Sequence, residues 1–182
     1  MEIQQAVGTM KETCNFLKRS GQRSHVLKQS FAANPDLSNR ELARVCETRW
    51  AERHNAVIIF VEALEVIVDA LENLEGGQDE RTTRDEKEKS PSTLQRALCN
   101  FRCIVTVIIL ERCMSVTYSL SKTLQDVQLD LFAAMEEVQR CIDMFQEMRE
   151  NDDTFPEIYE RAVEIASRLG VEPAKTRTVG TQ

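Results

Sequence analysis

Residues 50–74, WAERHNAVIIFVEALEVIVDALENL, contain the strongest periodic pattern in the chain. Large apolar residues recur from Val57 to Leu74 at spacings of 3, 4, 3, 4 and 3, which is the period of an α-helix. Other apolar residues, most of them β-branched, lie between these positions and widen the stripe, so we expect this helix to be buried on more than one side. Gly76 and Gly77 predict its end.

The same pattern predicts further helices on both sides of this one. We expect helices over residues 2–18 and 22–32, and a short helix that begins at a Ser38–Glu41 capping box and ends near Val45 or Cys46. A long helix is expected from Pro91 through Val116, with Ser92 and Gln95 as its capping box. Two more helices are expected, one ending near Glu150 and one running from Thr154 to Gly170. The expected inward-facing residues include Ile3, Met10, Cys14 and Leu17, then Leu131, Val138, Cys141, Ile142, Phe145 and Met148, and finally Phe155, Ile158, Ala162, Ile165 and Leu169.

These elements predict an all-α fold, an array of five to seven mostly antiparallel helices. The apolar run from Cys103 to Leu110 is rich in β-branched residues, but the flanking helical period favours a central helix over a strand. We expect one helical domain over residues 1–170, with a polar, disordered loop at residues 75–92 and a flexible tail at residues 171–182.

Composition narrows the class of protein further. The 182 residues are 42% hydrophobic and 29% charged, which is typical of a globular domain. No window of about 18 apolar residues lacks charge, so we expect no membrane-spanning helix. The first residues contain no apolar leader, so the six cysteines are expected to be reduced intracellular thiols.

Few residues offer catalytic or metal chemistry. The chain has only two histidines, and we expect His54 to lie at the surface or at a helix start. Cys99 and Cys103 have the i, i+4 spacing that lets two ligands share a metal, but buried cysteine is the more common use of such a pair. Gly-rich phosphate loops and G-x-S-x-G nucleophile motifs do not occur. We therefore expect no metal, no cofactor and no small-molecule substrate.

Charge is unevenly placed along the chain. Net charge is −7, yet residues 1–54 hold nine Lys/Arg against six Asp/Glu, and the remainder holds fourteen against twenty-four. Trp50, the only tryptophan, lies between Arg49 and Arg53, an arrangement in which an indole stacks on a base while guanidiniums hold phosphate. The candidate residues for nucleic-acid contact are therefore Arg49, Trp50 and Arg53, with Arg23 and Arg40. The alternative is that Trp50 anchors the core and the arginines form a solvated helix face of a protein-interaction module.

Several short motifs together resemble the hAT-superfamily transposases. Cys46-Glu47-Thr48-Arg49-Trp50 is similar to the family's Cys-x-Thr-Arg-Trp signature, and the match extends over essentially the whole chain in order and spacing. It is closest to the branch that contains the zinc-finger MYM-type proteins. The other matching elements are Phe16…Ser20…Arg23, Phe101–Leu110, Leu120–Gln125 followed by Asp130, Arg149, Phe155…Ile158, and Arg177…Gln182.

The resemblance implies the helical insertion of an RNase H-like transposase from which the catalytic core is absent. In the family, two metal-binding aspartates lie before this region and a glutamate lies after it, so no residue here inherits a catalytic role. The tryptophan of the signature is linked to stacking on a flipped base, a role that the resemblance carries to Trp50. It also implies a domesticated or decayed transposase fragment, a nuclear location, and DNA or protein partners.

Overall fold

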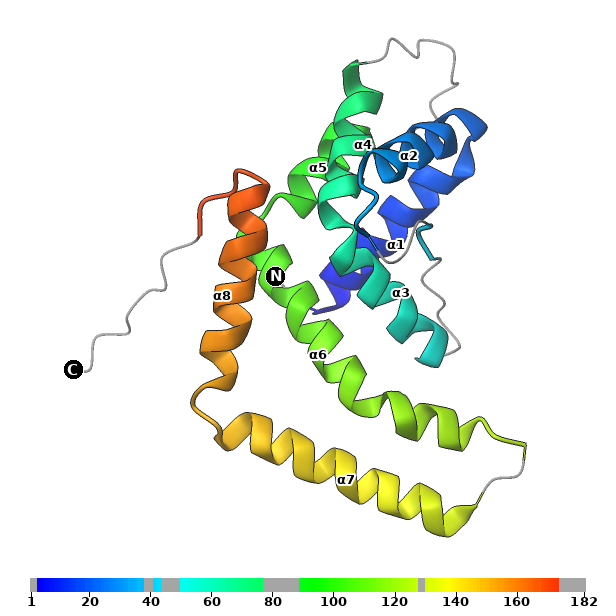
Figure 1. The fold of residues 1–182 in the computed structure, drawn as a ribbon, viewed down its shortest axis with the longest axis vertical. Helices are drawn as coiled ribbons and strands as arrows, with labels where there is room; N and C mark the ends of the chain where they lie inside the picture. The colour runs from blue at the N-terminus through cyan, green and yellow to red at the C-terminus, as the bar shows by residue number, and fades with distance from the viewer. Residues whose placement is uncertain (1–2, 38–40, 44–49, 77–88, 128–129, 174–182) are drawn as a thin grey trace, which may run out of the picture.

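The computed structural model describes residues 3–37, 41–43, 50–76, 89–127 and 130–173. Within these ranges the chain forms eight helices and no strand, which confirms the predicted all-α fold (Figure 1). Two of the expected long helices are each divided in two, while the short helix expected from Ser38 is not among the eight. The helices are α1 (Ile3–Arg19), α2 (Gly21–Ala33), α3 (Trp50–Glu62), α4 (Leu64–Gly76), α5 (Pro91–Leu98), α6 (Phe101–Leu124), α7 (Leu131–Glu150) and α8 (Thr154–Arg168).

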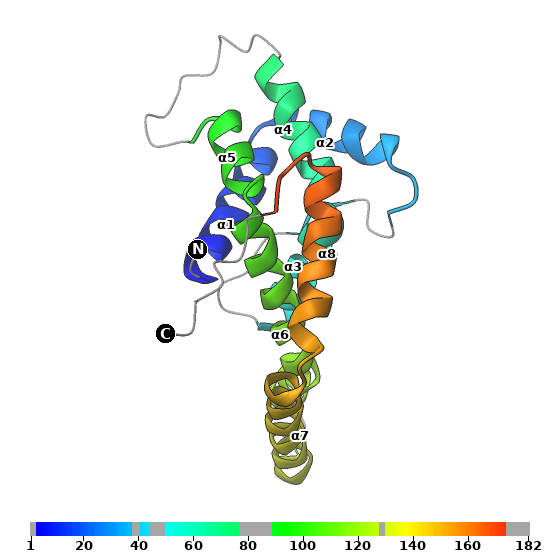
Figure 2. The same ribbon diagram turned by 90° about the vertical axis from the view of Figure 1, so that its left-hand side faces the viewer.

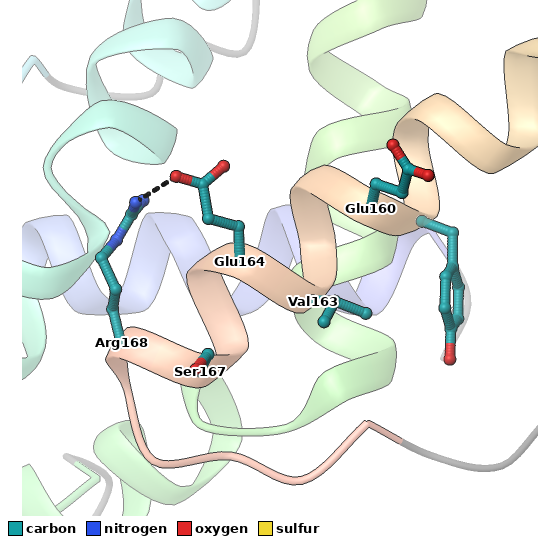
Figure 3. A pocket seen from close by; sticks show the side chains of 6 residues that line it. Glu160, Val163, Glu164, Ser167 and Arg168 are labelled. Atoms are coloured by element: carbon teal, nitrogen blue, oxygen red, sulfur yellow. Dashed lines mark hydrogen bonds and ion pairs between the residues drawn. The ribbon is translucent and has the colours of Figure 1, made fainter.

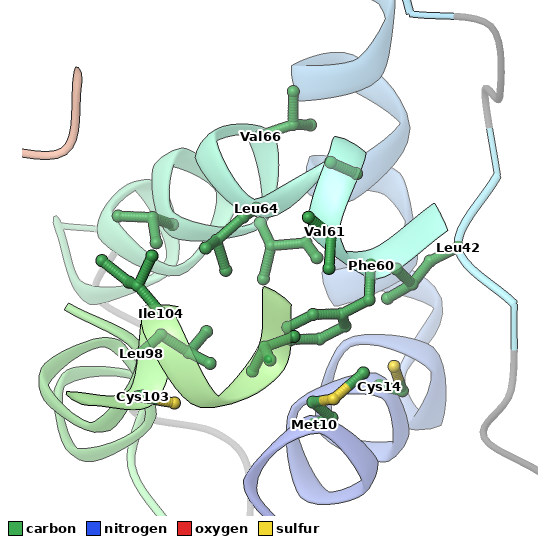
Figure 4. Packing of buried hydrophobic residues seen from close by; sticks show 14 of the residues in the cluster. Met10, Cys14, Leu42, Phe60, Val61, Leu64, Val66, Leu98, Cys103 and Ile104 are labelled. Carbon is green, nitrogen blue, oxygen red and sulfur yellow. The ribbon is translucent and has the colours of Figure 1, made fainter. Parts of the chain in front are cut away.

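Helix α6 is the centre of the architecture. It contacts α1, α3, α5, α7 and α8, while α4 packs against α2, α3 and α5 at the other end of the bundle. Figure 4 shows the shared core, in which the ring of Phe60 lies between Met10 of α1 and Leu98 of α5. Phe60 and Met10 are fully buried, and Leu98 is 1% exposed.

Length and composition alone would also allow α6 to cross a membrane, and among the described helices only α6 meets that test. In the protein, 44% of its most apolar 18-residue window is buried. Glu111 and Arg112 interrupt its middle, and both form ion pairs with residues of α8. These are the properties of a core helix that is covered by neighbouring helices.

The pattern over residues 50–74 folds as two helices with a bend at Ala63, so the expectation of one helix is wrong at this point. Backbone hydrogen bonds continue through the bend, from the Ala63 N–H to the Ile59 carbonyl (3.0 Å) and from the Ile67 N–H to the Ala63 carbonyl (2.9 Å). The bend lets α3 lie on α6 while α4 lies on α2 and α5. Tertiary packing therefore divides a helix that the sequence pattern alone makes continuous.

The expected helix from Pro91 to Val116 also divides, because Asn100 begins a new helix. Its side-chain oxygen accepts a hydrogen bond from the Arg102 N–H at 3.0 Å, which is an N-cap. At the start of α5 the cap is Ser90, which accepts from the Thr93 N–H at 3.3 Å, rather than the predicted Ser92. Helix α8 ends at Arg168, and the predicted stop residue Gly170 follows two positions later with a φ of +65°, the left-handed conformation that favours glycine.

Two other expectations of secondary structure and burial are wrong. Glu41–Ala43, the described part of the short helix expected from Ser38, is not helical, although Leu42 is fully buried. The rest of that helix, most of the loop at 75–92, and residues 174–182 of the tail lie outside the described residues. Ile3 and Phe155, both expected to face inward, are 51% and 54% exposed because they lie in the first turns of α1 and α8.

Helix α6 offers a matched test of this packing, because Ile104 is 2% exposed and Leu124, at its last position, is 53% exposed. We expect Ile104→Ala to lower the free energy of unfolding by about 2–5 kcal/mol, since it leaves a cavity in the core. Leu124→Ala should cost less than about 1 kcal/mol. Urea denaturation followed by circular dichroism measures both. Equal losses at the two positions would contradict the central place of α6.

Candidate functional site

The residues proposed for nucleic-acid contact lie at several places in the fold. Trp50 is the first residue of α3, and Arg53 is half-buried one turn later. Arg40 and Arg49 lie outside the described residues. Arg23 is in the first turn of α2, which packs against α1 and α4, whereas α3 packs against α6 and α4. Arg23 and Arg53 therefore lie on helices with different main neighbours, and nucleic-acid contact by these candidate residues stays a prediction.

Arg23 has a structural role where α1 meets α2. Its guanidinium lies over the ring of Phe16, 3.9 Å from the centroid, and donates a hydrogen bond to the Phe16 carbonyl at 3.4 Å. Ser20, between them in sequence, is the N-cap position of α2. All three residues belong to the motif Phe16…Ser20…Arg23. In this chain that motif fixes a helix–helix corner through a cation–π contact and a hydrogen bond.

A second motif with a structural role is Leu120–Gln125 followed by Asp130, at the end of α6 and the start of α7. The Gln125 amide donates to Ser121 Oγ at 3.0 Å, next to the end of α6. Asp130 caps α7 by accepting from the N–H groups of Phe132 (2.9 Å) and Ala133 (3.3 Å). These contacts define where one helix stops and the next begins.

His54 is the one buried histidine of the described residues, which corrects the expectation of a surface position. It is 6% exposed and links α3 to α6: Nε2 lies 3.3 Å from Ser115 Oγ, and the ring stacks on Tyr118 with centroids 4.3 Å apart. Lys122 covers the Tyr118 ring at 4.9 Å. Burial lowers the pKa of His54. Ser115 Oγ also donates to the Glu111 carbonyl at 2.9 Å, so this hydroxyl is held as a structural partner rather than as an activated nucleophile.

Two grooves are present on the described surface. One, of about 630 Å³, runs along α8 and is lined by Tyr159, Glu160, Val163, Glu164, Ser167 and Arg168 (Figure 3). The Arg168 guanidinium there donates to Glu164 at 2.7 Å and also pairs with Glu65 of α4. The other groove, of about 550 Å³, lies between α2 and α4 beside Asp69 and Glu72. Neither brings a nucleophile next to a general base, which is the arrangement that covalent catalysis needs.

The cysteines lie mostly in the core, as predicted. Cys14, Cys103 and Cys141 are buried, and Cys99 and Cys113 are half-buried. Burial raises the pKa of Cys14 to about 12 and that of Cys103 to about 11, which makes both thiols poor nucleophiles and poor metal ligands. No group of three or more His, Cys, Asp or Glu within the described ranges could hold a metal ion.

The largest group of exposed apolar residues lies on α7, where the inward-facing prediction is confirmed for Cys141 and wrong for Leu131, Val138, Ile142 and Phe145. Only Ala134 and Cys141 of this helix are buried. The exposed apolar residues are Leu131 (69%), Phe132 (82%), Met135 (71%), Val138 (42%), Ile142 (45%) and Phe145 (36%). Five of them, Leu131, Met135, Val138, Ile142 and Phe145, repeat at spacings of 4, 3, 4 and 3, and we call these five the α7 stripe. This heptad spacing is a signal that also marks helix-pairing seams.

The contacts between α7 and α6 explain why the α7 stripe is left uncovered. The Glu137 carboxylate accepts from Ser119 of α6 at 2.6 Å and from Arg140 at 2.5 and 3.2 Å. The hydrogen bonds from Arg140 and Ser119 lower the pKa of Glu137. Cys141 donates from Sγ to the Val116 carbonyl at 3.3 Å. Since these residues turn one side of α7 toward α6, the α7 stripe lies beside the contact rather than within it.

Comparison with known proteins identifies relatives but no family model and no solved structure that matches. Over 97% of its length the chain is 29% identical to the human protein named 52 kDa repressor of the inhibitor of the protein kinase. The mouse protein of the same name is 27% identical over 94% of the chain. The chain is homologous to part of these repressors. It spans about a quarter of their length, 24% in each case.

His54 predicts a specific pH dependence of stability. Its pKa is lowered in the folded chain, so the unfolded chain binds the proton first as pH falls. The neutral ring therefore contributes its full stabilisation above about pH 6.5, the ordinary histidine value, and loses it as pH falls below that value toward the folded pKa. We expect His54→Gln to reduce the fall in unfolding free energy between pH 7.5 and pH 5.5, measured by urea denaturation. His25→Gln, on an exposed position of α2, is the matched control. Identical pH profiles for wild type and His54→Gln would contradict the assignment.

Proposed function

We propose that this chain is a non-catalytic helical segment of a protein derived from a hAT-superfamily transposase, and that it binds another protein through α7. The observation that carries the binding function is the α7 stripe together with Phe132, a contiguous row of large apolar side chains at least 36% exposed. Contiguous exposed apolar patches on soluble domains mark interaction sites.

The transposase origin rests on the shared motifs and on what two of them do here. The Phe16–Arg23 corner and the Asp130 cap stabilise helix ends, so the resemblance lies in residues that determine the fold. The absence of catalysis is inferred from the family, whose acidic metal ligands lie outside the matching region. A nuclear location is proposed on the same ground. The name of the human and mouse relatives, a repressor of an inhibitor, also fits binding better than chemistry.

Site-specific photo-cross-linking tests the binding function. A benzophenone side chain at Met135, which is 71% exposed within the α7 stripe, should give discrete cross-linked products in the nucleus. The same group at Glu147, an exposed position on the opposite side of α7, should give few or none. Equal labelling from both positions, or none from either, would contradict a binding role for the α7 stripe.

DNA contact near Trp50 is the second candidate function. It is supported by the resemblance and by the position of Trp50 at the start of α3, with Arg53 one turn later. Backbone N–H groups at a helix start and nearby arginines both favour phosphate. The acidic net charge of −7 opposes strong non-specific binding.

The fluorescence of Trp50 tests this candidate directly, because the chain has no other tryptophan. If Trp50 stacks on a base, titration with single-stranded or hairpin DNA should give quenching that saturates and weakens as salt rises. Arg49→Ala should remove the effect. A blue-shifted emission that DNA leaves unchanged would indicate a tryptophan buried as a helix anchor.

A further inference from the structure

The hairpin of α6 and α7 projects from the rest of the bundle. In Figure 2, α7 lies at the far end of the molecule, below the layer formed by α1–α5. Its main contacts are with α6. One side of a 20-residue helix, about 30 Å long, is therefore available to another molecule.

We propose that the α7 stripe binds the α7 stripe of a second copy of this chain, with the two helices antiparallel. This proposal rests on the proposed binding function and names the partner. The spacing of 4, 3, 4 and 3 keeps one seam facing a partner helix along its length. Because a two-fold interface uses the same patch on both subunits, one stripe is enough to build it.

The size of the patch fits a pair of identical chains. If a fully exposed large apolar side chain presents about 200 Å², the exposed fractions of the α7 stripe leave roughly 500 Å² on each chain. Stable interfaces of standard size bury about 800 Å² per partner, of which about 65% is apolar in homodimers. The apolar area of the α7 stripe is therefore close to what one subunit of a dimer contributes.

Charge selects the antiparallel arrangement. Gln139 and Gln146 border the stripe on the side away from α6, while the acidic Glu136 and Asp143 lie farther round the helix. Two stripes therefore meet without like charges between them. Arg149 continues the stripe at the C-terminal end, and an antiparallel pair centred on Val138 brings it near Asp130, the N-cap residue of α7 in the second copy. A parallel pair would place the two Arg149 side chains together instead, which is unfavourable.

The same centre pairs residues of suitable size. Val138 lies opposite Val138 of the second copy, where the helices come closest. Leu131 lies opposite Phe145 of the second copy at either end of the seam. The two hairpins then form a four-helix arrangement of α6, α7 and their symmetry copies, the geometry in which such seams are commonly buried.

Sedimentation equilibrium of the full chain tests the proposal. The mass should rise from 20.8 kDa toward twice that value over a roughly hundredfold range of concentration. Met135→Ser with Ile142→Ser should raise the dissociation constant at least about 100-fold, as expected for two buried anchors. Glu136→Ser with Asp143→Ser is the matched control, with the same residue introduced at the same spacing on the same helix, and it should leave association unchanged. Circular dichroism confirms that both double variants fold.

Orientation is tested by disulfide trapping between two variants that each add one cysteine to the six native ones, Leu131→Cys and Phe145→Cys, mixed in equal amounts, with the unsubstituted chain as the background control. The antiparallel pair should give the mixed disulfide several-fold in excess of either homodimer. An excess of the two homodimers would overturn the antiparallel arrangement.

If the chain stays monomeric at every concentration, the proposal that the α7 stripe binds a second copy of this chain is overturned. If the benzophenone at Met135 still gave discrete products in that case, the proposed binding function would stand with a different protein as partner. If the Met135→Ser, Ile142→Ser variant dimerised as well as wild type, the α7 stripe would be excluded as the interface.

Discussion

The fold depends on the burial of α6, a helix whose first half is apolar on nearly every side. Ten residues of α6 are buried, and the helix packs against α1, α3, α5, α7 and α8. Exposing these residues to water would lower the stability of the fold strongly, since apolar burial is the main stabilising term. The bend at Ala63 and the break at Asn100 both follow from this constraint, because each lets a neighbouring segment change direction and remain against the core.

Helical periodicity predicted the existence and the approximate length of most elements, because each core-facing stripe has to repeat every 3.6 residues. Periodicity failed where tertiary packing or a helix cap divides a segment whose apolar residues keep the spacing of one continuous helix. Ala63 carries no local break signal, so the bend is visible only in three dimensions. Asn100 does carry one, as an N-cap residue before an apolar run, and it lies inside a pattern that otherwise looks continuous.

The candidate sites were predicted less well than the fold, for a physical reason. An apolar stripe on a helix indicates that the stripe packs against another surface. It does not show whether that surface belongs to the same chain or to a second molecule. Four residues of the α7 stripe, Leu131, Val138, Ile142 and Phe145, were therefore expected to face the core, although the structure leaves them exposed. His54 is the opposite case: a polar residue in a charged stretch, AERH, is buried because Tyr118 and Ser115 supply a stacking surface and a hydrogen bond from a helix 61 residues away.

The attachment of α7 has a consequence for the dynamics of the chain. Two buried residues, Ala134 and Cys141, and the Ser119–Glu137–Arg140 network hold α7 in place, whereas α6 is held from many sides. Segments with so few buried contacts open at a free energy well below that of global unfolding. The amides of α7 would then exchange with solvent without the core melting. Evolution can accordingly alter the sequence of α7 with little penalty to the rest of the molecule, which makes this helix the natural place for partner specificity to diverge.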